Sequence, residues 1–152
     1  DRTSRGLGDV YKRQELESRW LGLRIRLLDS LEDVEHCFVL GTPDESLPNT
    51  LNLGFQGISA ESLLICLDLD GIAVSSGSAC SSGAMEASHV LLAMGYSHEQ
   101  AKSSLRISMG WNTSEEDIEE LSRKLIHHVK RLTPISGKSD SNIQIPEPVT
   151  EI

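Results

Sequence analysis

The chain has 152 residues, of which 38% are hydrophobic and only 4% aromatic, and its net charge is −9 at pH 7. This length suits one domain with a core built mainly from Leu, Ile, Val and Ala. The negative charge repels phosphate backbones and argues against direct nucleic-acid binding. No apolar run approaches the roughly 20 residues that span a bilayer, and no signal peptide is visible, so we expect a cytoplasmic protein without a membrane segment.

The first half of the chain alternates between helical and strand patterns. Residues 1–14 show neither helical nor strand periodicity of apolar residues, and we interpret them as a non-native or disordered segment. From Glu15 onward, apolar residues at helical spacing predict an amphipathic helix: Leu16, Trp20, Leu23, Leu27 and Leu31. Residues 37–40 form a short apolar run typical of a buried strand. Residues 50–55 alternate with period two, as a half-buried strand does.

A second helix and a third strand are expected next. Ser59 is a candidate N-cap, and Gly71 can end the helix in a left-handed conformation. Residues 72–75 have the composition of a strand, and residues 75–83 are a run of small side chains. Residues 86–94 are expected to form another helix, which ends before Gly95.

The last third of the domain has clear helix signals. Ser97 and Gln100 have the spacing of a capping box. Residues 105–109 are the fourth expected strand. Thr113 and Glu116 are the expected capping box of a final amphipathic helix, which has an acidic start and a basic end. From residue 133 the sequence is polar and without pattern, which predicts a mobile tail over 133–152.

Helices and short strands therefore alternate over one domain, residues 15–132. This order predicts an α/β (α+β) fold, with about four short strands in a layer and helices packed on it.

One segment has the composition of a reactive site. Seven of the ten residues from Val74 to Gly83 are Ser or Gly, so the segment should be an exposed and mobile loop, and it carries Cys80. Neighbouring hydroxyls or a following helix N-terminus would favour the thiolate. The composition supports a reactive cysteine and a flexible loop with an incidental cysteine equally well. Cys37 and Cys66 lie in apolar stretches and are expected in the core. No CxxC pair is present, so neither a metal site nor a disulfide framework is expected.

Four stretches of the sequence together resemble one known family. They are LNL at 51–53, GIAVSSGSACSSG at 71–83, SHVL at 88–91 and SSLRISMG at 103–110. The sequence from about residue 15 to 132 resembles the C-terminal small domain of cysteine desulfurases of the NifS/IscS-like group, within the class-V aminotransferase superfamily.

The resemblance implies the chemistry of a pyridoxal 5′-phosphate-dependent transferase of fold type I. Such an enzyme takes sulfur from L-cysteine, releases L-alanine and keeps the sulfur as a persulfide. By motif match Cys80 is the catalytic nucleophile, and Arg106 binds the substrate carboxylate through its guanidinium fork. Asn52 also matches the family pattern, with a structural role as well supported as a substrate contact. His89 is more simply a capping or packing residue than an acid or base.

The resemblance also sets expectations for the rest of the enzyme. The family's large domain, with the lysine that bonds the cofactor, precedes the matching segment and is not in this sequence, so we interpret the chain as a truncated record. The 152-residue chain should therefore be inactive alone and hold no pyridoxal phosphate. The parent enzyme would be a homodimer that passes sulfur to an iron–sulfur scaffold protein or another acceptor. Two alternatives stay open: a non-catalytic fragment that binds a sulfur acceptor, and a selenocysteine lyase or other class-V enzyme.

Overall fold

The computed structural model describes residues 2–42, 46–77, 79–81 and 84–133, with the backbone alone at 2–5, 79–81 and 84–86. Its elements follow in chain order: α1 Arg2–Ser30, β1 Cys37–Val39, β2 Thr50–Phe55, α2 Ala60–Leu69, β3 Ser75–Ser76, β4 Ala79–Ser81, β5 Ala84–Glu86, α3 His89–Ala93, α4 His98–Lys102, β6 Ser104–Ser108 and α5 Glu115–Leu132. The predicted α/β class is confirmed by these elements.

A four-stranded antiparallel sheet forms the middle of the molecule, in the order β1-β2-β6-β3. Strands β2 and β6 are its centre, and β2 has the bounds that the period-two alternation predicts. Strand β3 is shorter than the expected run from residue 72 to 75, because only Ser75 and Ser76 pair with β6. A separate two-stranded hairpin, β4–β5, follows β3.

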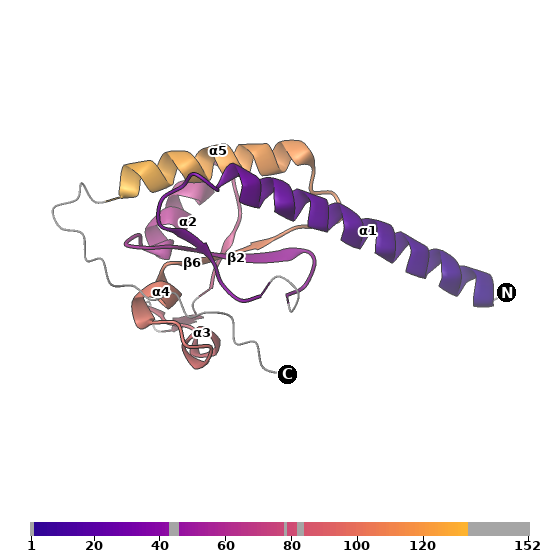
Figure 1. The fold of residues 1–152 in the computed structure, drawn as a ribbon, viewed down its shortest axis with the longest axis horizontal. Helices are drawn as coiled ribbons and strands as arrows, with labels where there is room; N and C mark the ends of the chain where they lie inside the picture. The colour runs from indigo at the N-terminus through magenta and orange to yellow at the C-terminus, as the bar shows by residue number, and fades with distance from the viewer. Residues whose placement is uncertain (1, 43–45, 78, 82–83, 134–152) are drawn as a thin grey trace.

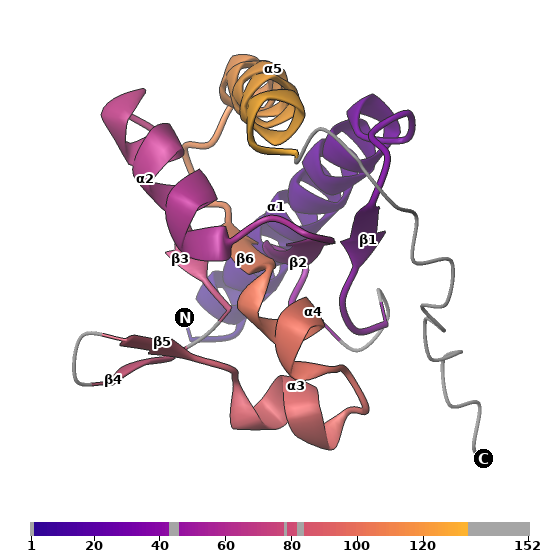
Figure 2. The same ribbon diagram turned by 90° about the vertical axis from the view of Figure 1, so that its left-hand side faces the viewer.

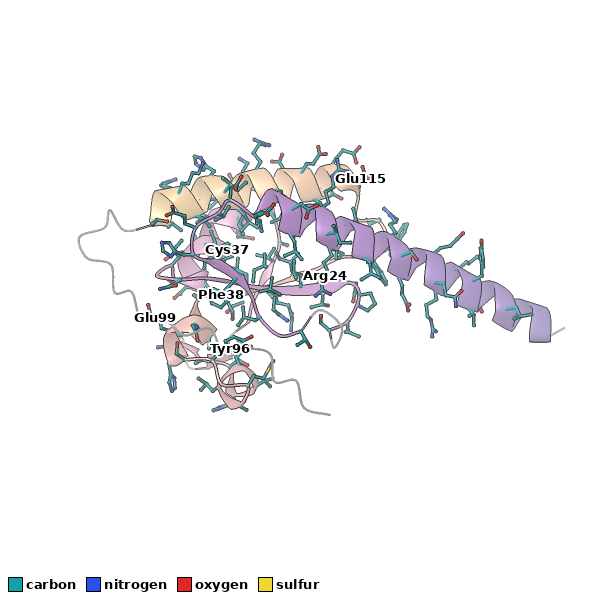
Figure 3. The ribbon with its side chains drawn as sticks, viewed as in Figure 1. Arg24, Cys37, Phe38, Tyr96, Glu99 and Glu115 are labelled. Atoms are coloured by element: carbon teal, nitrogen blue, oxygen red, sulfur yellow. The ribbon has the colours of Figure 1, made fainter. Side chains whose placement is uncertain are left out.

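Helices α1, α2 and α5 cover one face of the sheet, and α3 and α4 lie on its other side (Figures 1 and 2). Side chains alternate between the two faces of each strand. On β1, Cys37 packs against the core under the long helices, whereas Phe38 packs against the cluster of α3 and α4 (Figure 3). Tyr96 closes that smaller cluster, where its hydroxyl accepts a hydrogen bond from the Gly41 amide at 2.9 Å.

Leucines dominate the main core, as the low aromatic content predicts. The fully buried side chains of this core come from α1, β2, α2, β6 and α5, and the largest are Leu27, Leu51, Leu53, Phe55, Leu63, Leu67, Leu105 and Leu125. Because each of these elements buries one face or stripe, the sheet is held from one side by three helices. The other face of the sheet carries polar residues where α3 and α4 do not cover it.

Helix α1 begins at Arg2 rather than at Glu15. Side chains from Trp20 to Leu31 pack on the core and stabilise this part of the helix, so extending it toward the N-terminus adds one hydrogen bond per residue without a new nucleus. Leu7, Val10 and Tyr11 on this extension are exposed, which is why the sequence shows no periodic stripe there. The extension projects beyond the sheet (Figure 1). Whether residues 1–14 are native, and where the domain ends, stay predictions; the expected tail lies outside the described residues from 134 on.

Two helix starts differ from the sequence prediction. The N-cap of α5 is Ser114, with Asp117 as its capping-box partner, instead of Thr113 with Glu116. Thr113 is engaged elsewhere, because its Oγ1 accepts a hydrogen bond from the Gly110 amide at 2.8 Å. The expected helix over 86–94 begins only at His89, because Glu86 pairs with Ala79 in the β4–β5 hairpin.

The other helix caps are those that the sequence predicts. Ser59 caps α2, and Ser97 with Gln100 forms the capping box of α4. Gly71 and Gly95 have φ angles of 80° and 93°, so each follows its helix in the left-handed region that favours glycine.

Candidate functional site

A row of polar residues crosses the centre of the open sheet face. Arg106 on β6 is the register partner of Asn52 on β2 and of Ser75 on β3. Directly opposed residues in neighbouring antiparallel strands share a face, with about 5 Å between their Cβ atoms. The row therefore places Asn52, Arg106 and Ser75 side by side on three adjacent strands. The sheet brings together two of the three residues that the sequence singles out as a site.

The alternation along β6 explains why Arg106 points away from the core. Leu105 and Ile107 are buried on the helix side, whereas Arg106 and Ser108 are exposed. Within the described part of the chain, the Arg106 guanidinium has no carboxylate partner and no hydrogen bond. An exposed guanidinium without a partner on a rigid strand can bind a carboxylate through two parallel hydrogen bonds.

The loop that follows β6 is fixed by α1. The Trp20 indole donates to the carbonyl oxygen of Gly110 at 2.9 Å, and Arg19 donates to the carbonyl oxygen of Trp111 at 2.8 Å. These bonds satisfy carbonyl groups that belong to no regular element. They hold the C-terminal end of β6, and with it the row of Arg106, against the long helix.

The backbone of Cys80 is connected to this row by a short stretch of chain. It sits in β4 opposite Met85 of β5, so the segment predicted as a loop without regular structure contains a hairpin. Its side chain lies outside the described residues. Cys80 follows Ser75 by five positions, and five residue steps span at most about 17 Å. The chain thus tethers Cys80 within reach of the residue that faces Arg106.

The other two cysteines are in different surroundings. Cys37 packs against the main core, as predicted, and burial raises the pKa of its thiol to about 11. At neutral pH it is therefore a thiol and a poor nucleophile. Cys66 is half-buried on α2 and does not pack in the main core, so its predicted core position is wrong; both cysteines are free. His89 is exposed as the first residue of α3, where it neither caps the helix nor packs in the core.

Three residues of the site region were not singled out from the sequence. Ser75 completes the row, and Gly77 and Ser104 touch at the base of the hairpin. A glycine among serines gives no periodic signal, and strand register depends on contacts that are distant in sequence. Among residues 2–42, 46–77, 79–81 and 84–133, no group of three or more His, Cys, Asp or Glu could hold a metal ion. Helices in the same ranges are too short or too polar to cross a membrane.

The family model of aminotransferase class-V proteins matches residues 10–121. Because this match covers most of the sequence, the chain belongs to the class-V aminotransferase family. Its curated relatives include cysteine desulfurases. The cysteine desulfurase IscS of Photorhabdus laumondii is 41% identical over 138 residues, and that of Salmonella arizonae is 40% identical. Within the family, the chain belongs to the NifS/IscS-like group. Each match covers 86% of this chain but 34% of the relative, so the chain spans about a third of the length of these relatives.

Solved structures agree with this assignment. A NifS-like protein superposes with a TM-score of 0.69 at 28% identity, covering 81% of this chain and 30% of that one. A NifS-like protein from Rickettsia africae gives 0.64 at 30% identity, with 76% and 29% covered. A putative sugar aminotransferase from Streptococcus pneumoniae gives 0.59 at 13% identity, which shows the fold alone. The predicted fold class, that of a fold-type-I transferase dependent on pyridoxal phosphate, is thereby confirmed.

Proposed function

We propose that this chain is the C-terminal small-domain part of a pyridoxal-phosphate-dependent cysteine desulfurase. The parent enzyme takes sulfur from L-cysteine and leaves it as a persulfide on Cys80. One observation carries the proposal: Arg106 has no partner in the described part of the chain, and it faces Ser75, from which five residues lead to Cys80. A carboxylate-binding group and a tethered thiol are two of the parts that a desulfurase acting on cysteine needs, beside its cofactor. Relatives named cysteine desulfurase at about 40% identity support the same activity.

The sulfur transfer balances without an external oxidant or reductant. The Cys80 thiolate attacks the sulfur of the substrate, so that a sulfur–sulfur bond forms and the carbon–sulfur bond of the substrate breaks. The electron pair of the broken bond stays with the substrate carbon, which takes up a proton and becomes the methyl group of alanine. L-Cysteine and the thiol of Cys80 thus become L-alanine and the persulfide of Cys80.

Arg106 would orient the substrate through its carboxylate. A guanidinium on a strand holds a carboxylate in one plane, and this aims the substrate sulfur in a defined direction. Asn52 lies beside Arg106 in the row and is half-buried, so its amide would hold either the carboxylate or the guanidinium. Either contact restricts the rotation of the substrate.

The cofactor would be held by another part of the parent enzyme. Pyridoxal phosphate acts as the electron sink in such reactions. In the described ranges, Lys12, Lys124 and Lys130 lie on α1 and α5, across the sheet from Arg106, and Lys102 is exposed at the end of α4. These residues do not fit a cofactor site, so the proposed role of this chain is limited to binding the substrate and carrying its sulfur.

The sulfur acceptor follows from the chemistry of a persulfide. Its outer sulfur can pass to a second thiol, such as a cysteine of an iron–sulfur scaffold protein or of another thiolation enzyme. We infer a cytoplasmic homodimer for the parent enzyme, as the resemblance to cysteine desulfurases implies.

The proposal is tested in the parent enzyme by Cys80→Ser. The variant should lose persulfide formation and alanine release from L-cysteine, because serine cannot take up the sulfur as a persulfide. Its cofactor absorption should be unchanged. Cys66→Ser, the same change at a half-buried position on α2, is the matched control and should keep the activity. Persulfide formation retained by Cys80→Ser would exclude Cys80 as the carrier. Release of selenium from selenocysteine without release of sulfur from cysteine would point to a selenocysteine lyase instead.

A further inference from the structure

The chain that leads to Cys80 is held against β6 at one glycine. The Gly77 amide donates to the carbonyl oxygen of Ser104 at 2.9 Å, which continues the β3–β6 register by one residue beyond Ser76. A Cβ atom at Gly77 would lie 2.2 Å from Ser104 Oγ and 3.1 Å from Ser104 Cβ. Both distances are shorter than a normal van der Waals contact. The φ angle of Gly77 is not in the left-handed region, so close approach is the reason for glycine here.

Ser104 cannot move aside to admit a larger residue. Its side chain is fully buried, and its Oγ donates to the carbonyl oxygen of Ala101 at 2.7 Å. If the hydroxyl turned away, it would lose this bond, and the Cβ contact would remain. The backbone of Ser104 is also fixed from β2, where Gly54 is its register partner and Phe38 packs over Gly54. The surface that Gly77 touches is therefore rigid.

We propose that Gly77 and Ser104 are positioning residues for sulfur transfer, because their contact fixes the point from which the chain reaches Cys80. The inference rests on the proposed function. Gly77 follows Ser75 by two residues, and Ser75 faces Arg106. Only three residues then lead to Cys80, which span about 10 Å at most. The β4–β5 hairpin projects from this end of β3 (Figure 2). The contact thus limits how far the sulfur carrier can lie from the carboxylate-binding arginine.

The contact predicts a split between substrate binding and reaction rate. A methyl group at position 77 would push the chain away from β6 and shift the start of the Cys80 hairpin. A displacement of about 1 Å from reaction geometry can lower a rate about 100-fold. Arg106 stays in place, because β6 remains paired with β2 on its other side. Gly77→Ala in the parent enzyme should therefore lower the rate of persulfide formation about 100-fold and change the KM for L-cysteine less than about threefold.

Removal of the opposing side chain should rescue the defect. In Gly77→Ala combined with Ser104→Gly, both short contacts disappear, so most of the lost rate should return. Combined with Ser104→Ala, the 3.1 Å contact with Cβ remains, and the rescue should be smaller. Gly22→Ala is the matched control, since a Cβ there has nothing within 4 Å, and it should leave the rate unchanged.

A second measurement does not depend on activity. In the unchanged 152-residue chain, the amide at position 77 should be protected from hydrogen exchange. It should lose this protection in Gly77→Ala and regain it when Gly77→Ala is combined with Ser104→Gly. If the amide loses protection but the rate of sulfur transfer is unchanged, the positioning role is wrong and the desulfurase assignment stands. If Ser104→Gly does not restore the rate lost in Gly77→Ala, the positioning role is also wrong. Persulfide formation that survives Cys80→Ser would instead overturn the proposed function.

Discussion

The arginines of this chain differ in what their side chains meet. Arg24 on α1 is buried, and its Nη2 donates to Ser46 Oγ at 3.1 Å (Figure 3). Arg26 is exposed and forms ion pairs with Glu115 and Glu119 of α5. Arg106 is exposed and has no acidic partner within the described ranges. A buried arginine such as Arg24 or an ion-paired one such as Arg26 contributes to structure, whereas an exposed arginine without a partner on a rigid strand is available to a ligand.

Substitution of Arg106 by lysine tests this availability. The ammonium group would keep the charge but lose the fork, so one of two charge-assisted hydrogen bonds to the substrate carboxylate would be lost. Such a bond contributes about 1.5–3 kcal/mol, which corresponds to roughly a 10- to 100-fold fall in kcat/KM for L-cysteine. Steady-state kinetics of the parent enzyme measures the effect. Arg123→Lys on the exposed face of α5 is the control, and an equal loss in both variants would contradict the carboxylate role.

At the scale of elements, two polar contacts of Asp70 join the end of α2 to α5 beside their apolar packing. Asp70, the C-cap of α2, lies 2.6 Å from the Nε2 atom of His128 and 3.4 Å from the Nζ atom of Lys124. The other ring nitrogen of His128 is buried without a partner in the described part of the chain. The hydrogen bond from His128 lowers the pKa of Asp70 below its ordinary value of 3.8, and the charge of Lys124 adds to this.

This contact predicts a loss of stability in acid. A carboxyl group with a lower pKa in the folded state stabilises the fold above its unfolded pKa, and this contribution is lost as the pH falls through the folded value. The free energy of unfolding should therefore decrease below about pH 4. In Asp70→Asn the decrease should be smaller, and the stability at pH 7 should be lower. Urea unfolding between about pH 2 and pH 7 measures both. Asp68→Asn, an exposed position on the same helix, should behave like the unchanged chain.

Across the whole molecule, local patterns predicted the elements but not their arrangement. Strand β2 and the caps Ser59 and Ser97 follow from side-chain spacing, because periodicity and capping act within a few residues. The row of Arg106, Asn52 and Ser75 could not be derived in this way, since register is fixed by the burial of Leu51, Leu53, Leu105 and Ile107 against the helices. The β4–β5 hairpin was missed because serine and glycine give no alternation. Cys80 and Arg106 were predicted as site residues through the family resemblance, and their roles stay predictions.

The lysines of the chain lead to a last prediction, about the cofactor. The five lysines include four that lie on helices and Lys138, which is outside the described residues. A cofactor lysine has to be desolvated beside a phosphate-binding site, whereas Lys12, Lys102 and Lys130 are exposed to water and Lys124 pairs with Asp70. This chain alone, mixed with pyridoxal phosphate, should therefore form no lysine-bound cofactor with a fixed stoichiometry and release no alanine from L-cysteine. Borohydride reduction followed by peptide mass mapping checks all five lysines, with the parent enzyme as the positive control. One lysine labelled to completion, together with turnover, would contradict the assignment of the cofactor site to another part of the enzyme.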